Sequence, residues 1–294
     1  MASSSRDEAI EAPPPRDGEC LFGSVLQYAV AALETNSLDE KVALTLECER
    51  RFESGEIPVR APDEQVAVAP AHPGRPSDVT TVEASRAVRK RGVAGLVHAL
   101  AHIESYAIDL SWDVLCRFFC DWPDLPREFF EDWVRVAGEE ARHFVMWRDR
   151  LSDLGSSYGA LPVHDGLWES AAETAHDLLA RLCVVHMVHE ARGLDVFPVQ
   201  EAKFGRCGDE ESARRLRIIH GEEVTHVAAG VRWFKWGCRR LGKDPQTAFR
   251  ELVAAHFHGD LKPPFNVEAR DLAGFHRNWY MPVGEGAAGV SLAC

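Results

Sequence analysis

The most constraining feature of this sequence is a carboxylate and histidine pattern that occurs twice. In each copy a glutamate set among apolar residues is followed, more than thirty residues later, by the motif Glu-x-x-His. The six residues are Glu104, Glu140 and His143 in the first copy, and Glu190, Glu223 and His226 in the second. The glutamate and the motif are separated by 36 residues in the first copy and by 33 in the second. Each gap suits one helix, a short loop and an antiparallel return along a second helix.

The spacing within each motif has a chemical consequence. Residues three positions apart lie on one face of a helix, so the carboxylate and the imidazole can bind the same metal ion. A carboxylate can also bridge two ions. Oxygen ligands with one imidazole per metal favour iron or manganese over metals that prefer thiolates. One Glu-x-x-His motif alone is more often a solvated pair, but two copies with matching partners predict a two-metal site inside four helices.

Four sequence runs around these residues resemble the DUF455 family of ferritin-like domains. They are LVHALAHIE (96–104), EEARHF (139–144), HEARGLDV (189–196) and EEVTHV (222–227). The resemblance extends over about residues 21–282. It implies an all-α fold, a ferritin-like four-helix bundle around two metal ions. Iron is the expected metal, and manganese or a mixed iron and manganese pair is the alternative. The ferritin superfamily includes oxygen-activating enzymes, among them a tRNA hydroxylase, and iron-storage proteins.

Hydrophobic periodicity and proline content divide the chain into five expected segments. These are a disordered N-terminus (1–19), a pair of helices (20–56), a connector with five prolines (57–82), the metal-binding bundle (83–242), and a C-terminal helix with an irregular covering segment (243–294). Within them we expect helices at about 21–33, 38–52, 83–120, 127–153, 167–193, 209–241 and 245–257. Gly193 is the expected end of the third bundle helix, because glycine commonly follows a helix C-terminus.

Several residues near the ligands are candidates for supporting roles. Glu139 and Glu222 each precede a ligand glutamate by one position, which rotates them about 100° away on the helix. They are expected to hydrogen-bond to the ligands or to be solvated. His186 lies four residues before Glu190 and so on its helical face. A hydrogen-bonded core histidine is the favoured interpretation for it, with a partner of a ligand or an extra ligand as alternatives.

Two further expectations concern residues farther from the motifs. Asp177 and Asp195 are candidates to orient the ligand imidazoles through their free ring nitrogens. The stretch 258–282 shows no helical period but is rich in aromatic residues. It is expected either to wall a cavity beside the metals, with Asn266, Arg270 or Arg277 orienting a substrate, or to cover an apolar flank of the first and fourth bundle helices.

Composition limits the possible partners and location. The chain has 294 residues, of which 46% are hydrophobic, so it can bury a large core. A net charge of −13 argues against an extended surface for nucleic acid or for anionic membranes. No apolar run is long enough to span a bilayer, and the acidic N-terminus is unlike a secretion signal. Eight dispersed cysteines suggest reduced thiols. We therefore expect a soluble cytoplasmic protein, with an organelle as the alternative.

These observations together predict a non-haem di-iron oxidoreductase that activates O2 to oxidise a small organic substrate, with the possible help of an electron donor. One alternative is a ferritin-like protein that oxidises or stores iron or removes peroxide, which would form a large assembly. A second alternative is a non-enzymatic helical scaffold with a structural metal centre. In the favoured hypothesis the metals are bridged by Glu140 and Glu223. The terminal ligands are Glu104 and Glu190. One metal is bound by His143 and the other by His226.

Overall fold

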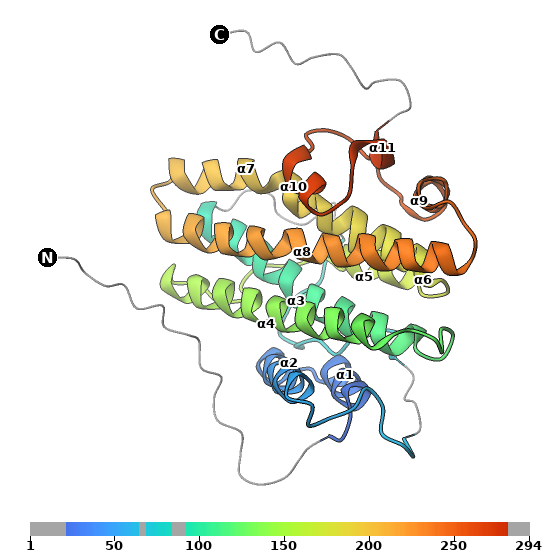
Figure 1. The fold of residues 1–294 in the computed structure, drawn as a ribbon. Helices are drawn as coiled ribbons and strands as arrows, with labels where there is room; N and C mark the ends of the chain where they lie inside the picture. Colours follow the sequence, from blue (N-terminus) through green and yellow to red (C-terminus); the bar gives the residue numbers. More distant parts are fainter. Residues whose placement is uncertain (1–21, 65–68, 84–91, 282–294) are drawn as a thin grey trace, which may run out of the picture.

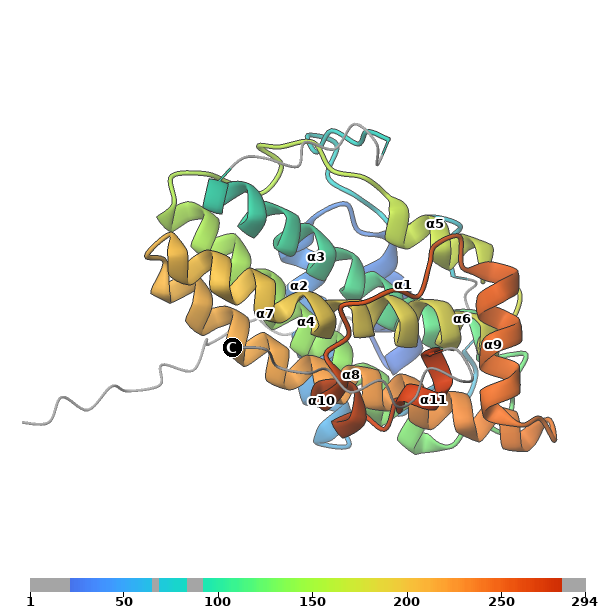
Figure 2. The ribbon, with the colours of Figure 1, turned by 90° about the horizontal axis from the view of Figure 1, so that it is seen from above.

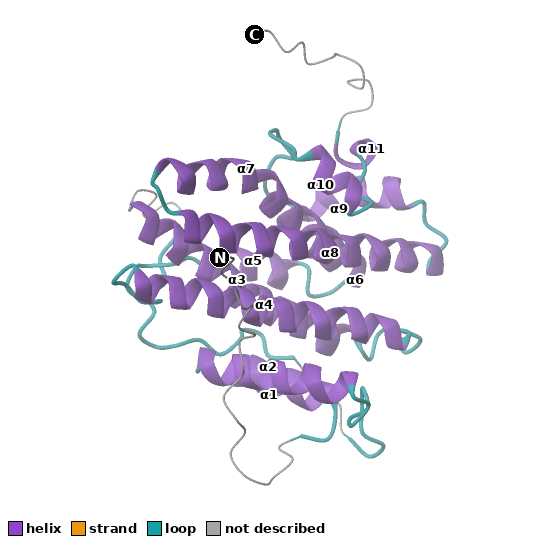
Figure 3. Ribbon diagram, turned by 60° about the vertical axis from the view of Figure 1, so that its left-hand side comes forward, coloured by secondary structure: helices purple, strands orange, loops and turns teal. Residues whose placement is uncertain are grey.

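The computed structural model describes residues 22–64, 69–83 and 92–281 of the chain. These residues form helices and loops, apart from one isolated bridge between Thr81 and Val163 (Figure 3). The expected all-α fold class is therefore confirmed. The N-terminal residues 1–21, the residues 84–91 at the expected start of the first bundle helix, and residues 282–294 lie outside the described part.

Two helical hairpins form the centre of the molecule (Figures 1 and 2). In each hairpin the two long helices pack along each other and are joined by a short loop. The first hairpin consists of α3 (Gly92–Phe118) and α4 (Arg127–Asp153). The second consists of α8 (Glu210–Arg240) and a composite helix made of α6 (Leu178–Cys183), the π-helix η1 (Val184–His189) and α7 (Glu190–Arg206). The long helix α8 packs against both α4 and α6, so it joins the two hairpins.

The N-terminal helices cover the outside of the first hairpin. Helix α1 (Val25–Glu34) packs on α3, and α2 (Leu38–Glu53) packs on α4, as seen at the bottom of Figure 1. The two serines at positions 24 and 37 cap these helices, each accepting a hydrogen bond from the backbone amide three residues later. Lys41 of α2 is fully buried and forms an ion pair with Asp109 of α3. Because a buried charge is costly without a partner, this pair fixes how α2 sits on α3.

The third bundle helix was expected at 167–193, and these bounds are wrong. The chain first forms α5 (Gly166–Glu173) and then breaks before α6. Asp177 begins α6, since its side chain accepts a hydrogen bond from the amide of Ala180 at 2.9 Å. The helix does not end at Gly193 but continues to Arg206, and Gly208, with φ of 70°, follows its end.

The C-terminal part begins with α9 (Pro245–His256), as expected. The stretch after it, for which no helical period was expected, contains two short helices, α10 (Val267–Leu272) and α11 (Arg277–Tyr280). Helix α10 packs on α7 and α8, and α11 packs on α9. The segment therefore covers the second hairpin and not α3, as Figure 1 shows near its top.

A buried arginine anchors this C-terminal segment. Arg270 of α10 donates two hydrogen bonds to Asp195 of α7, at 2.8 and 2.6 Å, and both side chains are buried. Its guanidinium also lies 4.3 to 5.1 Å from the ring centroids of Phe265, Phe275 and Tyr280. The six cysteines in the described part are free, and four of them are buried. None of the described helices combines the length and the apolar character needed to cross a membrane.

Candidate metal centre

The structure brings all six residues of the repeated pattern together in the interior. Ligating atoms of Glu104, Glu140, His143 and Glu223 all lie within 4.8 Å of one another. His226 lies beside Glu140, and Glu190 interacts with Glu223. Each of the four long helices contributes: Glu104 from α3, Glu140 and His143 from α4, Glu190 from α7, and Glu223 and His226 from α8. The spacing in the sequence therefore predicted a real cluster.

The distances within the cluster follow an approximate two-fold arrangement. The Nδ1 atom of His143 lies 3.2 Å from Glu140 Oε2 and 3.6 Å from Glu223 Oε1. The Nδ1 atom of His226 lies 2.9 Å from Glu140 Oε1 and 3.6 Å from Glu223 Oε2. Glu140 and Glu223 thus each direct one oxygen to one imidazole and the second oxygen to the other. This is the arrangement that two carboxylates need in order to bridge two ions.

The other ring nitrogens are held by carboxylates that cross between helices. His143 of α4 has its Nε2 atom 2.6 Å from Glu222 of α8, and His226 of α8 has its Nε2 atom 2.7 Å from Glu139 of α4. Since a carboxylate accepts, each Nε2–H donates, which leaves each Nδ1 to face the cluster. Of the two roles expected for Glu139 and Glu222, hydrogen bonding to the ligands is therefore the one that the structure supports.

The buried charges raise the pKa values of three groups in the cluster. Burial and the neighbouring Glu140 carboxylate raise the pKa of Glu104 well above its usual value, and burial and Glu223 do the same for Glu190. Burial alone would lower the pKa of His143, but the carboxylates of Glu140 and Glu222 raise it to about 10. Without a metal, protons on these groups balance the charge of the cluster.

The donor set fits a pair of hard divalent cations. Glu140 Oε1 and His226 Nδ1 are buried and form an ion pair at 2.9 Å, but their alignment does not make a hydrogen bond. Buried polar atoms in folded proteins are nearly always satisfied. A cation bound between the two atoms would satisfy both of them. Four carboxylates also match the charge of two divalent ions, as the ligand pattern requires.

Trp147 is a neighbour of the cluster whose role the sequence interpretation missed. Its Nε1–H donates a hydrogen bond of 3.3 Å to Glu104 Oε1, and the side chain is fully buried. Trp147 follows His143 by four residues on α4, so its helical face could have indicated this contact.

The expected hydrogen bond of His186 is not found. The ring is buried and lies with its centroid 4.2 Å from that of Trp133, and its Nε2 has no hydrogen-bond partner among the described residues. Burial lowers its pKa well below the usual value. His186 belongs to the π-helix η1. Its ring still lies near enough to the cluster for the charges of Glu140 and His226 to act on its pKa.

Asp177 and Asp195 do not orient the imidazoles, so this expectation is wrong. Asp177 caps the N-terminus of α6, and Asp195 is bound by Arg270 and by the backbone amide of Asn266. Sequence alone could not pair these carboxylates, because their partners lie on other elements. The imidazoles are instead hydrogen-bonded by Glu139 and Glu222.

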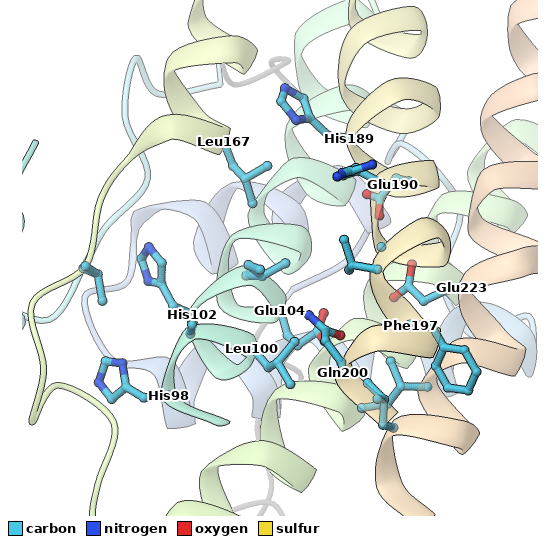
Figure 4. Close-up of a pocket in the computed structure, with 18 of the residues that line it drawn as sticks. His98, Leu100, His102, Glu104, Leu167, His189, Glu190, Phe197, Gln200 and Glu223 are labelled. Carbon is cyan, nitrogen blue, oxygen red and sulfur yellow. The ribbon is translucent and has the colours of Figure 1, made fainter. Parts of the chain in front are cut away.

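A cavity of about 620 Å³ lies directly beside the cluster. Glu104, Glu190 and Glu223 reach it, as Figure 4 shows, and its walls come from α3, α7, α8 and the loop 161–167. No described residue after position 223 lines it. The expectation that the C-terminal segment walls the cavity is therefore wrong: Asn266 and Arg270 are engaged by α7, and Arg277 is exposed.

Comparison with known proteins identifies the family but gives no activity. Residues 34–281 match DUF455, which is described as a protein of unknown function. A protein of Haemophilus influenzae (strain ATCC 51907 / DSM 11121 / KW20 / Rd), named only as uncharacterized, is 36% identical over 223 residues. That alignment covers 75% of this chain and 77% of the relative. No solved structure matches the chain. With a match that covers most of its length and includes every residue of the cluster, the chain belongs to the DUF455 family.

Proposed function

We propose that this protein is a ferritin-like, non-haem di-iron oxidoreductase that activates O2 to oxidise a small organic substrate. The observation that carries the proposal is the paired geometry of Glu140 and Glu223, each of which directs its two oxygens to two different imidazoles. The cavity that reaches the same carboxylates supports a substrate site beside the metals. Iron is favoured by the oxygen-rich ligand set, and manganese or a mixed pair would use the same donors.

The residues of the cluster divide into three roles in this proposal. Glu140 and Glu223 would bridge the metals, Glu104 and Glu190 would be terminal ligands, and each histidine would bind one metal through Nδ1. When bound, iron would supply the electrons that reduce O2. The chain supplies positions, charge balance and exclusion of water. In the metal-free protein burial raises the pKa values of Glu104 and Glu190, so bound metal would displace protons from both groups at the edge of the cavity.

The structure favours this function over the two alternatives. An iron-storage or iron-oxidising protein needs a polar route for Fe(II), whereas the walls of the cavity are mainly apolar side chains. A scaffold without chemistry would not need a cavity at the metal site, and its buried carboxylates would be costly without a cation. An electron donor and O2 remain the expected partners, and measuring the size of the native assembly separates a storage cage from an enzyme of few subunits.

The test is the metal content of protein purified without added metal. We expect two iron or manganese ions per chain in the natural sequence. Glu140→Ala and Glu223→Ala should each remove most of the metal, because each of these carboxylates serves both ions. Glu131→Ala, at an exposed position of α4, is the matched control and should keep two ions. Equal metal loss in all three variants would contradict the assignment. Metal-loaded protein in the reduced form should then consume O2.

A further inference from the structure

The cavity beside the cluster has walls of a distinct chemical character. Most of the side chains that line it are hydrocarbon: Ala99, Leu100, Ile103, Leu161, Pro162, Val163, Leu167, Val196, Phe197, Leu216 and Ile219. Ile103, with 46% of its surface exposed, and the exposed Arg192 lie where the cavity reaches the surface. His98 and His102 lie across the cavity from Glu190 and Glu223 in Figure 4. At about 620 Å³, the space is within the usual range for a ligand of drug-like size.

The histidines of the far wall have their hydrogen bonds within the protein. His98 Nε2 accepts from two backbone amides of the loop 159–161, at 3.0 and 3.4 Å. His102 Nε2 donates to the carbonyl oxygen of His164 at 2.9 Å, and its Nδ1 lies 2.9 Å from the hydroxyl of Tyr158. These rings hold the loop against α3, so they contribute ring surface to the wall and not free polar groups.

Two further histidines of the lining contact other side chains. His189 Nε2 is hydrogen-bonded to Ser170 at 3.0 Å, and His220 stacks on Phe197 at 3.8 Å between ring centroids.

Arg192 is the one lysine or arginine among the described lining residues, and it too is held within the protein. Its guanidinium donates to the carbonyl oxygens of Lys262 and Pro264 at 3.4 and 3.3 Å and lies 3.6 Å from Asp195. All three contacts use the Nη1 atom of Arg192, and the guanidinium is exposed at the mouth, where an ion pair with a ligand would contribute little.

We propose that the cavity binds an uncharged, largely apolar small molecule whose reacting carbon lies against the carboxylate wall. This deepens the proposed function and rests on it for the reaction and for the charge balance of the carboxylate wall, whereas the preference for an apolar ligand rests on the hydrocarbon side chains. An anion would find one lysine or arginine in the described lining, Arg192, at the exposed mouth. A cation would find those carboxylates already balanced by the two metals. Gln200, half-buried in the lining, offers one amide that can bind a carbonyl or hydroxyl group.

The first test compares ligands of equal length and different charge. The probes are 1-octanol, octanoate and octylamine, and binding to the metal-loaded protein is followed by calorimetry. We expect 1-octanol to bind at least about tenfold more tightly than either charged probe. Along a series of alcohols from butanol to octanol, affinity should rise about fourfold for each added methylene, as expected for burial of a CH2 group. Binding of octanoate or octylamine as tight as that of octanol would overturn the proposal.

Variants locate the binding in the cavity. Val196→Trp fills the space from α7, and Val199→Trp is the matched control, because Val199 on the same helix is 60% exposed and does not line the cavity. We expect Val196→Trp to weaken octanol binding at least about tenfold and the control to leave it unchanged. Ile103→Trp, at the exposed mouth, gives a second variant with little risk to folding. Equal octanol binding in all these variants would place the ligand elsewhere and overturn the proposal.

Metal content measured on the same samples separates this proposal from the proposed function. Protein that binds octanol in the cavity but no metal would refute the di-iron function and leave the cavity assignment standing. Protein that binds two metals but no uncharged probe would refute the cavity assignment and leave the metal centre standing. Both Val196→Trp and Val199→Trp should keep two metals, since neither residue is a ligand.

Discussion

At the scale of single residues, the orientation of the two imidazoles depends on carboxylates of the opposite hairpin. Glu222 accepts from His143 Nε2 at 2.6 Å, and Glu139 accepts from His226 Nε2 at 2.7 Å. Such partners fix the ring and make the metal-binding nitrogen more basic. They are not ligands in the proposed centre. Their removal should therefore weaken the binding of the metals without reducing their number.

We expect Glu222→Gln and Glu139→Gln each to lower metal affinity by about 10- to 100-fold while two ions still bind at saturation. The measurement is a competition titration against a metal-binding dye. Glu131→Gln, which changes an exposed carboxylate of α4, should leave the affinity unchanged. If a variant at position 139 or 222 binds only one ion at saturation, that glutamate is itself a ligand and the assignment above is wrong.

The six clustered residues could be predicted from the sequence because their arrangement depends on spacing along the chain. A Glu-x-x-His motif fixes its own geometry on a helix, and the similar gaps of 36 and 33 residues indicate which helices pair. The hydrogen bond from Trp147 to Glu104 and the crossing of Glu222 to His143 could not be predicted as firmly. Both join different helices, and their existence depends on how the helices are rotated against each other.

At the scale of secondary-structure elements, the composite second hairpin departs most from the expected helices. Asp177 is a recognisable helix start, so the break before α6 was readable from the sequence. The continuation beyond Gly193 was not, since it depends on burial of Leu194 and on the ion pair between Asp195 and Arg270. The π-helix η1 is likewise set by packing, because its sequence has no feature that distinguishes it from an α-helix.

The close approach of α8 to η1 requires a glycine. A Cβ atom on Gly230 would overlap the carbonyl oxygen of His186, whereas a Cβ on Gly221 of the same helix meets nothing within 4 Å. We expect Gly230→Ala to lower the free energy of unfolding by about 1 to 3 kcal/mol, as overpacking does. Gly221→Ala should raise it by about 0.5 to 1 kcal/mol through helix propensity. Denaturant unfolding measures both.

The pair of glycine variants tests the contact itself. Because alanine is introduced at two positions of one helix, any general effect of alanine is common to both variants. A stabilising Gly230→Ala would mean that α8 and the π-helix are not packed this closely. Displacement of η1 should also disturb Glu190, which directly follows it, so Gly230→Ala should bind metal more weakly.

At the scale of the whole molecule, the two hairpins bring a densely charged cluster into a protein interior. The sequence predicted this arrangement in outline, but not the cavity beside it, whose walls combine residues from α3, α7, α8 and the loop 161–167. A volume enclosed by four separate segments depends on their relative positions. No periodicity within one segment encodes it.

The cluster also links pH to the stability of the whole protein. In the absence of metal the folded protein holds protons on His143, with its pKa raised to about 10, and on Glu104 and Glu190, whose pKa values are raised by burial. The unfolded chain releases carboxyl protons above about pH 4.3 and imidazole protons above about pH 6.5. At these three groups the folded state binds more protons than the unfolded state, so their contribution to the stability of the metal-free protein falls as pH rises, and that of His143 is lost through about pH 10.

Metal binding should have the opposite pH dependence. Each metal must displace protons from the ligands, so affinity rises with pH, and a ligand that binds only the folded state raises the melting temperature. Between about pH 7 and about pH 8.5, where unfolded imidazoles are mostly neutral, we expect the Tm of chelator-treated protein to fall and the increase in Tm on adding Fe(II) without oxygen, or Mn(II), to grow. Glu140→Ala should show little increase at any pH. An increase that shrinks toward high pH would show that the metal does not bind by displacing the protons of this cluster.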